Sequence, residues 1–447
     1  MCYYFGPSRT HGRLEARAEL RRRGCSLATQ EWVDNHWSLI LWKLAGLVRA
    51  YPMDLTERWS WSHVIDQLLY RYEREINRGQ RPAVKKIQEQ DCASTRSMVL
   101  TVCQIKMTTR QKADDPDQTE EHPEFVLTDG WYKIRASVDD CLGRATKMAK
   151  IQVGTKIAMS GIKLDAAKEG KEVLKALDDT MLKLTGNSTC LARWYTKLGF
   201  APKPFVPTIA SLSPDGGNVV MLHITVTKMF PIGYIDAFVE GAPRPIPRCQ
   251  KEEDAAMDEW MKMWEKEQAD ECKEFEDRLQ KLEALAERLD HACGYKSVSR
   301  DLLPHWVDDV LDEFEEATDV KSLIKLKSRD ELSYLATAAH AKIAYERDNA
   351  QRTIEKAMEG RVPQRQVRNF QVACIEDART YHRTPMRTGQ LTVWDILSMG
   401  DEIIREGRSY LVSNIVPTQK GSWGKPAVAD SEVFLQTTRG TRWSPVP

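Results

Sequence analysis

The feature that constrains this chain most is a run of about 42 residues, 251–292, that contains neither glycine nor proline. Apolar residues in it step by four and three, which is the spacing of a coiled-coil seam: Phe275, Leu279, Leu282, Ala286 and Leu289. As one helix the run would reach about 60 Å, because an α-helix rises about 1.5 Å per residue. A second periodic stretch, 330–359, can pack back against it. The sequence therefore predicts a long antiparallel helical hairpin over 249–360.

Strand-like runs flank this hairpin on both sides. Two precede it and four follow it, at 218–230, 233–240, 364–379, 389–398, 408–418 and 433–438. A hairpin enters and leaves at nearly the same point, so it can be inserted between two neighbouring strands without breaking their pairing. We therefore expect one β-barrel that is built from 215–248 and 361–447 and interrupted by the hairpin.

The chain before residue 215 predicts a helical domain and another small barrel. Apolar residues recur at three- and four-residue steps, as in amphipathic helices, over 30–48, 62–76 and 83–89. From Phe125 the period changes to two, and Asp129-Gly130 separates two such runs as a hairpin turn does. Several short strands with one helix over about 100 residues suit a small barrel such as an OB fold. We expect an N-terminal extension at 1–29, a helical domain at 30–112 and a first barrel at 113–214.

The formal net charge is zero, with 65 basic and 65 acidic residues, but the charge is divided unevenly along the chain. By segment the net charge is +8 over 1–112, −7 over 113–130, +7 over 131–248, −12 over 249–360 and +4 over 361–447. Clustered cations attract polyanions even in a neutral protein. We expect any such partner on the basic segments and away from the acidic hairpin.

Several classes of protein are excluded by the sequence. No stretch approaches the roughly 18 apolar residues of a transmembrane helix, and the first ten residues lack the apolar core of a secretion signal. The ten cysteines show no Cys-x-x-Cys spacing, which indicates reduced thiols and neither disulfides nor zinc. Phosphate-binding loop, dinucleotide and zinc-protease motifs are missing. We expect no enzymatic activity, no cofactor and no metal.

Basic and aromatic residues are interleaved in the strands that follow the hairpin. OB folds bind single-stranded nucleic acid by placing cations on phosphates and aromatic rings on bases. The pattern gives a candidate DNA-binding set: Arg379, Tyr381, Arg383, Arg387, Trp394, Arg408, Tyr410, Lys420 and Arg439. The candidates for phosphates are Arg379, Arg383 and Arg408. The candidates for base stacking are Tyr381, Trp394 and Tyr410. The alternative for each residue is an ordinary barrel position.

The first barrel shows a similar mixture of rings and cations. Its members are Trp131, Tyr132, Arg193, Trp194, Tyr195 and Lys197. The alternative is that several of these aromatic rings belong to the barrel core, because they lie close to turns.

Specific strings, in order along the chain, carry a resemblance to a known family. In the helical region they are Trp32-Val-Asp-Asn-His-Trp37, Leu41-Trp-Lys-Leu-Ala45, Tyr70-Arg-Tyr-Glu-Arg-Glu-Ile76 and Ala83-Val-Lys-Lys-Ile87. In the first barrel they are Thr128-Asp-Gly-Trp-Tyr132, Val153-Gly-Thr-Lys-Ile157, Asn187-Ser-Thr189 and Ala192-Arg-Trp-Tyr-Thr-Lys-Leu-Gly-Phe200, followed by Asp215-Gly-Gly-Asn-Val219. Over about residues 30–440 the chain resembles the DNA-binding region of the breast cancer type 2 susceptibility protein family.

The resemblance implies a multidomain α+β fold. Its parts would be a helical domain, two OB-fold β-barrels, and a tower, which is the long antiparallel helical hairpin that interrupts the second barrel. The family normally has a third OB fold, which we expect to be absent because the chain ends at Pro447. The resemblance also implies a nuclear mediator of homologous recombination. Such a mediator binds single-stranded DNA at double-strand breaks and assists the loading of a RecA-like recombinase.

A small acidic partner, the split-hand/foot-deletion protein, is implied as well. In the family it wraps the helical domain and the first two OB folds, so it would suit the basic segments 1–112 and 131–248. The candidate partner-binding residues are Trp32, Trp37, Lys43, Arg71, Arg74, Lys85 and Lys86. No repeated recombinase-binding motif is present, so loading would depend on sequence outside this chain. The segment 300–317 at the tower tip holds seven acids and one arginine. We expect weak duplex binding there, because phosphate contacts need cations.

Two rival functions remain open at this point. One is a protein-interaction scaffold of a repair complex that binds no DNA. The other is a nuclease or another DNA-processing enzyme, which the missing carboxylate and histidine motifs disfavour. Binding of an oligonucleotide at increasing salt separates the first rival from the DNA-binding hypothesis.

Overall fold

The computed structural model describes residues 3–111, 119–167, 169–237, 245–295, 298, 303–317, 319–379, 387–399, 404–424 and 431–446. The chain divides into two compact units: Met1–Pro231 with Phe370–Pro447, and Ile232–Asn369. Within the described ranges, none of the helices combines the length and the apolar character that crossing a lipid bilayer requires.

The helical domain lies at the start of the first unit. Its helices are α1 (Arg13–Arg22), α2 (Gln30–Ala50), α3 (Leu55–Arg58), α4 (Trp61–Tyr72) and α5 (Ala83–Gln88). Thr29 caps α2 and Ser60 caps α4, because each hydroxyl oxygen accepts a hydrogen bond from a backbone N–H of the first turn. The predicted helices over 30–48, 62–76 and 83–89 are confirmed, whereas α1 forms within the stretch expected as an extension.

The first barrel follows the helical domain. Its elements are β1 (Met98–Gln111), β2 (Thr119–Thr128), β3 (Lys133–Val138), α6 (Asp140–Lys147), β4 (Lys156–Met159), β5 (Lys163–Asp165), β6 (Met181–Leu184), β7 (Thr189–Leu191) and β8 (Gly199–Phe200). β6 pairs in parallel with β3, and β7 pairs with β4. The short turn Gly186–Ser188 separates β6 from β7, so these two strands act as halves of one strand that closes the barrel.

The boundary between the helical domain and the first barrel differs from the expected one. β1 lies before residue 113, where we expected the barrel to begin, and it pairs with both β2 and β4. Val84 and Ile87 of α5 belong to the core of this barrel, together with Leu100 of β1. The apolar and threonine residues of β1 are therefore the first strand of the barrel and not the end of the helical domain.

The second barrel is a closed ring of strands. Its strands are β9 (Val219–Met229), β11 (Val367–Asp377), β12 (Thr388–Trp394), β13 (Ser409–Pro417) and β14 (Glu432–Val446). β11 pairs with β9 and β12, β12 pairs in parallel with β14, and β13 closes the ring between β14 and β9. This is the five-stranded Greek-key arrangement of an OB fold, as predicted.

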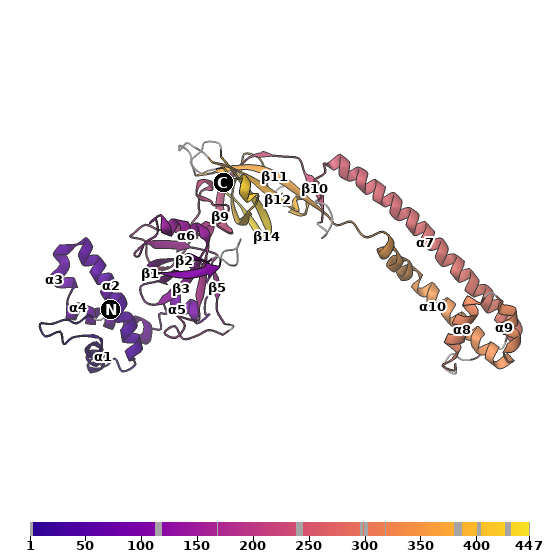
Figure 1. Ribbon diagram of the computed structural model, residues 1–447, viewed down its shortest axis with the longest axis horizontal. Coiled ribbons are helices and arrows are strands. Elements are labelled where there is room, and N and C mark those ends of the chain that lie inside the picture. The colour runs from indigo at the N-terminus through magenta and orange to yellow at the C-terminus, as the bar shows by residue number, and fades with distance from the viewer. Residues whose placement is uncertain are drawn as a thin grey trace. The chain divides into compact units, whose positions relative to one another are not determined.

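The second unit contains the tower. It comprises β10 (Gly233–Asp236), α7 (Gln250–Cys293), α8 (Val307–Glu316), α9 (Val320–Leu326) and α10 (Arg329–Arg361). α7 and α10 lie along each other, with α8 and α9 at their far end (Figure 1). The predicted seam is confirmed, because Leu282, Ala286 and Leu289 are buried in a core shared with α10 and α8, Leu279 packs against that core and Phe275 is buried as well. The hairpin leaves the second barrel after β9 and returns at β11, so it is an insertion between the first two strands of that barrel.

Candidate nucleic-acid interface

Aromatic side chains lie on the outer face of β11 and β12. Alternate residues of β12 are buried, which leaves Thr392 and Trp394 on the outer face. Phe370 of β11 is paired directly with Trp394, and the two ring centroids are 5.3 Å apart at an angle of 52°. β11 and β12 are the second and third strands of the barrel, and the outer face of these strands is where OB folds bind oligonucleotides.

The outer face continues onto the strands on either side. Phe434 and Gln436 point outward from β14, because the residues between and before them are buried. The Trp394 Nε1–H donates a hydrogen bond to Gln436 Oε1 at 3.4 Å. On β9 the Lys228 ammonium lies 4.9 Å from the ring centroid of Phe230. We define the aromatic face by five residues: Lys228, Phe230, Phe370, Trp394 and Phe434.

Arg387 is buried beneath the loop between β13 and β14. It is 5% exposed, and its Nη1 and Nη2 donate to the backbone oxygens of Leu212 at 3.1 Å and Gly424 at 2.7 Å. Its guanidinium lies 5.4 Å from the ring centroid of Trp423, and burial lowers the pKa of Arg387. This burial contradicts the predicted contact of Arg387 with DNA. The side chain instead holds the loop that carries Lys420 and Trp423.

Tyr410 also lies inside the protein. It is 2% exposed, its hydroxyl accepts a hydrogen bond from the Arg405 N–H at 2.9 Å, and its ring packs against Trp443 at 5.6 Å. The ring belongs to the core of the second barrel, which contradicts the predicted stacking on a base. Two further candidates, Tyr381 and Arg383, lie outside the described residues.

The other predicted cations are exposed but lie at different places on the barrel. Arg379 follows β11, where its Nε donates to His223 Nδ1 at 3.3 Å. Arg408 directly precedes β13, Lys420 begins the short turn after that strand, and Arg439 lies in the second half of β14. Trp394 lies on the aromatic face as predicted, whereas Arg379 and Arg408 are at strand ends.

The sequence interpretation missed Phe370, Phe434, Phe230 and Lys228. A usable signal was present, because residues two apart in a strand share one face. Phe434 lies between the buried Val433 and Leu435, so its outward direction follows once those two are assigned to the core. Phe370 is recognised as part of the aromatic face only through its pairing with Trp394. The sequence does not specify this pairing.

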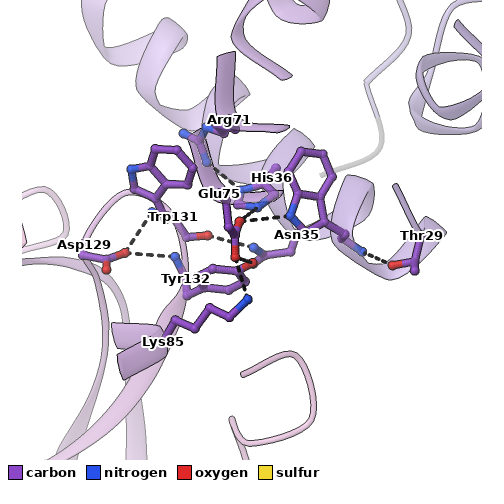
Figure 2. A network of polar contacts seen from close by, with 10 residues as sticks. Thr29, Asn35, His36, Arg71, Glu75, Lys85, Asp129, Trp131 and Tyr132 are labelled. Carbon is purple, nitrogen blue, oxygen red and sulfur yellow. Dashed lines mark hydrogen bonds and ion pairs between the residues drawn. The ribbon is translucent and has the colours of Figure 1, made fainter. Parts of the chain in front are cut away.

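The junction between the helical domain and the first barrel is built around Glu75. Its carboxylate accepts hydrogen bonds from Lys85 Nζ at 2.8 Å and Tyr132 Oη at 2.7 Å (Figure 2). It accepts another from Trp32 Nε1 at 3.1 Å. Burial by itself raises the pKa of Glu75, but the nearby His36 and the hydrogen bonds from Lys85 and Tyr132 lower it to about 2. Glu75 therefore stays ionised and ties helical-domain residues to the barrel residue Tyr132.

His36 and Arg71 extend this network. Arg71 Nη1 lies 2.8 Å from His36 Nδ1. Arginine can only donate a hydrogen bond, so Nδ1 is the acceptor and the imidazole proton sits on Nε2, 3.5 Å from Glu75 Oε2. Burial lowers the pKa of His36 to about 4 and that of Arg71 to about 10. The Arg71 guanidinium also lies 5.1 Å from the ring centroid of Trp131 in the barrel (Figure 2).

The predicted partner-binding residues fall into three groups. Trp32, Trp37 and Arg71 are only 5%, 1% and 6% exposed, so their burial contradicts direct contact with a partner. Lys85 is engaged by Glu75. Lys43 and Arg74 are exposed and Lys86 is half-buried.

One group of side chains has ligand types suited to a metal ion. Among the described residues, Glu120, His122 and Asp140 place a possible ligand atom each within 4.8 Å of one another. However, Arg110 lies 3.7 Å from Asp140, and His122 Nε2 is engaged with the Val138 oxygen at 2.8 Å. A cation already neutralises part of this group.

Comparison with known proteins identifies similarity over nearly the whole chain. The family model "BRCA2, helical" matches residues 23–79, and "BRCA2, oligonucleotide/oligosaccharide-binding, domain 1" matches residues 82–202. Two Arabidopsis thaliana relatives, the BREAST CANCER SUSCEPTIBILITY 2 homologs B and A, are each 26% identical over 96% of this chain. The chain spans 36% of the length of either relative.

A solved structure also matches this chain. It is described as a replication protein A heterotrimer bound to ssDNA, is 8% identical, and aligns over 79% of this chain and 49% of its own with a TM-score of 0.20. A score this low does not establish a shared fold, so this match carries no functional argument.

Proposed function

From the premise that the chain belongs to the BRCA2 family, we propose that it binds single-stranded DNA in double-strand break repair by homologous recombination. The observation that supports the proposal is the aromatic face of the second barrel. Two of its rings, Phe370 and Trp394, lie on the outer surface of the second and third strands, and Phe434 and Phe230 extend this surface on either side. The activity would be binding without bond chemistry, in agreement with the missing enzyme motifs.

The aromatic face suits DNA that has no partner strand. Bases of single strands can stack on Phe370, Trp394 and Phe434, and each stack contributes about 1–3 kcal/mol. Stacking tolerates any base because every base has a π-face. Lys228, at the edge of the face, would contact a phosphate. The proposed binding is therefore largely independent of sequence and sensitive to salt.

The test is fluorescence anisotropy of a labelled oligothymidine with the purified chain over a range of salt concentrations. Affinity should fall steeply with salt, by about 0.7 log units per phosphate contact per decade of salt. Trp394→Ala and Phe370→Ala should each weaken binding about fivefold or more, as expected for loss of one stack. Tyr345→Ala, which removes a ring that is 65% exposed in the tower, is the matched control.

The DNA-binding proposal would be rejected if no binding is detected at about 50 mM salt, where such contacts are strongest. Adding magnesium to the same mixture tests the remaining enzymatic rival. Cleavage of the oligonucleotide would contradict a purely binding role.

The finer role we propose is a nuclear recombination mediator that assists loading of a RecA-like recombinase. The family membership supports this role, and this chain would bind the DNA. A small acidic partner of the split-hand/foot-deletion type would contact the exposed cations of the helical domain, of which Arg74 and Lys86 are accessible. Recombinase filament assembly on DNA covered by a single-strand-binding protein, with and without this chain and partner, tests both parts.

A protein-interaction scaffold remains the second candidate, and one observation favours it. The part of α7 at residues 254–274, which we call the stem, exposes Met257, Met261 and Met263 at 41%, 47% and 51%, beside the stacked rings of Trp260 and Trp264. Exposed apolar patches mark sites of protein association. If the chain binds protein partners but no oligonucleotide at low salt, the scaffold function replaces the DNA-binding one.

A further inference from the structure

A groove of about 800 Å³ lies between α2 of the helical domain and the first barrel. Three cations line it: Lys43 and Arg49 from α2, and Lys156 from β4. Apolar side chains such as Trp42 and Leu198 form much of the rest, and no carboxylate is among the lining residues. The groove therefore combines positive charge with apolar walls.

The three cations have no anionic partner in the part of the chain that the structure describes. The contact that Lys156 makes is with a backbone oxygen, at 2.6 Å from its Nζ to Thr196. Partial desolvation lowers the pKa of Lys156 and that of Lys43, although Lys43 keeps an exposed side chain, and the positive charges of Arg71 and Arg58 lower the pKa of Lys43 further. Cations that line a groove without a carboxylate among them are stabilised by an anion. The groove is therefore prepared for a negatively charged ligand.

Exposed aromatic rings stand beside this groove. Trp194 is 76% exposed and Tyr195 is 59% exposed, with their ring centroids 5.9 Å apart. The loop that carries them is fixed to the groove wall by the hydrogen bond from Lys156 to Thr196. Arg193 donates to the Tyr195 hydroxyl at 2.6 Å, which adds a further cation next to the rings. The segment 181–214 around them contains four basic residues and no acidic one.

We propose that this groove and the rings of Trp194 and Tyr195 form a second binding site for single-stranded nucleic acid. Phosphates would contact Lys43, Arg49 and Lys156, and bases would stack on the two rings. An acidic peptide would use the cations but leave the exposed rings without a role, so the combination favours nucleic acid. The inference goes beyond the proposed function, which concerns the aromatic face of the second barrel, and rests on it only for the class of ligand.

A second site changes how the affinity for an oligonucleotide depends on the length of that oligonucleotide. When one strand engages two sites on the same protein, binding to the second site becomes intramolecular and the overall affinity rises. An oligothymidine of about 30 nucleotides should therefore bind more tightly than one of about 10, because one OB fold covers about 4–16 nucleotides. Variants of either site should reduce this gain from length.

The experiment is a salt titration of the full chain with the longer labelled oligothymidine. Trp194→Ala should weaken binding about fivefold or more, as for loss of one stack. The double variant Lys43→Gln/Arg49→Gln should reduce the salt slope by about 1.4, since each phosphate contact on a single strand contributes about 0.7. Lys163→Gln, an exposed lysine of the same barrel outside the groove, is the matched charge control, and circular dichroism confirms that each variant is folded.

Unchanged affinity and slope in both groove variants would overturn the proposal. If these variants instead lose a labelled poly-glutamate peptide while binding oligothymidine normally, the groove accepts an acidic protein and the proposal is also overturned. If the groove variants weaken oligothymidine binding but Trp394→Ala and Phe370→Ala do not, the groove site stands and the proposed role of the second barrel fails.

Discussion

At the scale of single residues, one buried carboxylate joins the helical domain to the first barrel. Glu75 is 5% exposed and receives three donors that come from both sides of the junction. A buried charge is tolerated only when it is paired and hydrogen-bonded. Because each of these donors also loses a partner if the carboxylate is removed, the network acts as a unit.

Glu75→Gln should therefore lower the free energy of unfolding by about 2–4 kcal/mol, since it removes a buried ion pair and weakens charge-assisted hydrogen bonds. The folded-state pKa of Glu75, about 2, lies below the ordinary value of 4.5. The ionised group thus stabilises the fold above pH 4.5, and this contribution is lost as the pH falls from 4.5 to 2. Urea unfolding at pH 7 and across the acid range measures both effects.

The control is Glu73→Gln, two residues away, where an exposed glutamate pairs with Arg78 on the surface. That change should alter the free energy of unfolding by less than about 1 kcal/mol. The interpretation of the junction fails if both variants are equally stable, or if Glu75→Gln loses stability over the acid range as steeply as the wild type.

The sequence identified the right types of residue, namely aromatic and basic ones in strands of this barrel. It did not show which of them point outward and which point into the core. Trp394 and Tyr410 are both aromatic residues of strands in the same barrel, yet one lies on the outer face and the other in the core. A period of two shows which residues share a face, but the buried face is set by the register of the closed ring. The burial of Arg387 was missed because its hydrogen-bond partners are two backbone oxygens. Every residue has a backbone oxygen, so the sequence does not show which ones accept from Arg387.

At the scale of elements, α7 consists of two stretches with different packing. Between residues 254 and 274 no side chain of the helix is buried, whereas five are buried between Leu282 and Cys293. The stem is crossed by surface ion pairs such as Arg361 with Glu271 at 2.8 Å, and such pairs contribute little stability. The helix continues through the stem mainly because it lacks glycine and proline.

Hydrogen exchange should reveal this difference within one continuous helix. Backbone amides of 254–274 are expected to exchange faster than those of 282–293, because local opening there exposes little apolar surface. Exchange measured by mass spectrometry on peptides from each half makes the comparison. Equal protection along the whole helix would contradict it and would indicate that something covers the stem.

The sequence predicted secondary-structure elements well where the hydrophobic pattern is long and depends only on neighbouring residues of the same element. The seam of the tower needed only the steps from Phe275 to Leu289, which depend on one helix. The residues of β1 were assigned to the helical domain, because their membership of the barrel depends on pairing with β2 and β4. Short strands become a barrel through contacts distant in sequence, and no local pattern specifies these.

At the scale of the whole molecule, the second barrel closes without help from the tower. β9 and β11 pair directly, with Met229 opposite Ala373, and the same strands contribute Val226 and Ile375 to the barrel core. The chain leaves β9 and returns to β11 at adjacent points, so the inserted unit of 232–369 occupies the position of an ordinary hairpin loop. Short loops of this kind are common between antiparallel strands.

Replacing 232–369 by a short Asn-Gly linker should therefore leave a folded barrel that still binds oligothymidine, because the aromatic face lies entirely in the unit that remains. The deletion removes the segment 249–360 with its net charge of −12, so affinity at low salt should stay the same or rise as repulsion of the phosphates is relieved. Near-ultraviolet circular dichroism reports the packing of the barrel, and anisotropy titrations at low and high salt report binding. A folded deletion variant that no longer binds would place part of the DNA site in the tower, and a variant that does not fold would show that the insertion stabilises the barrel around it.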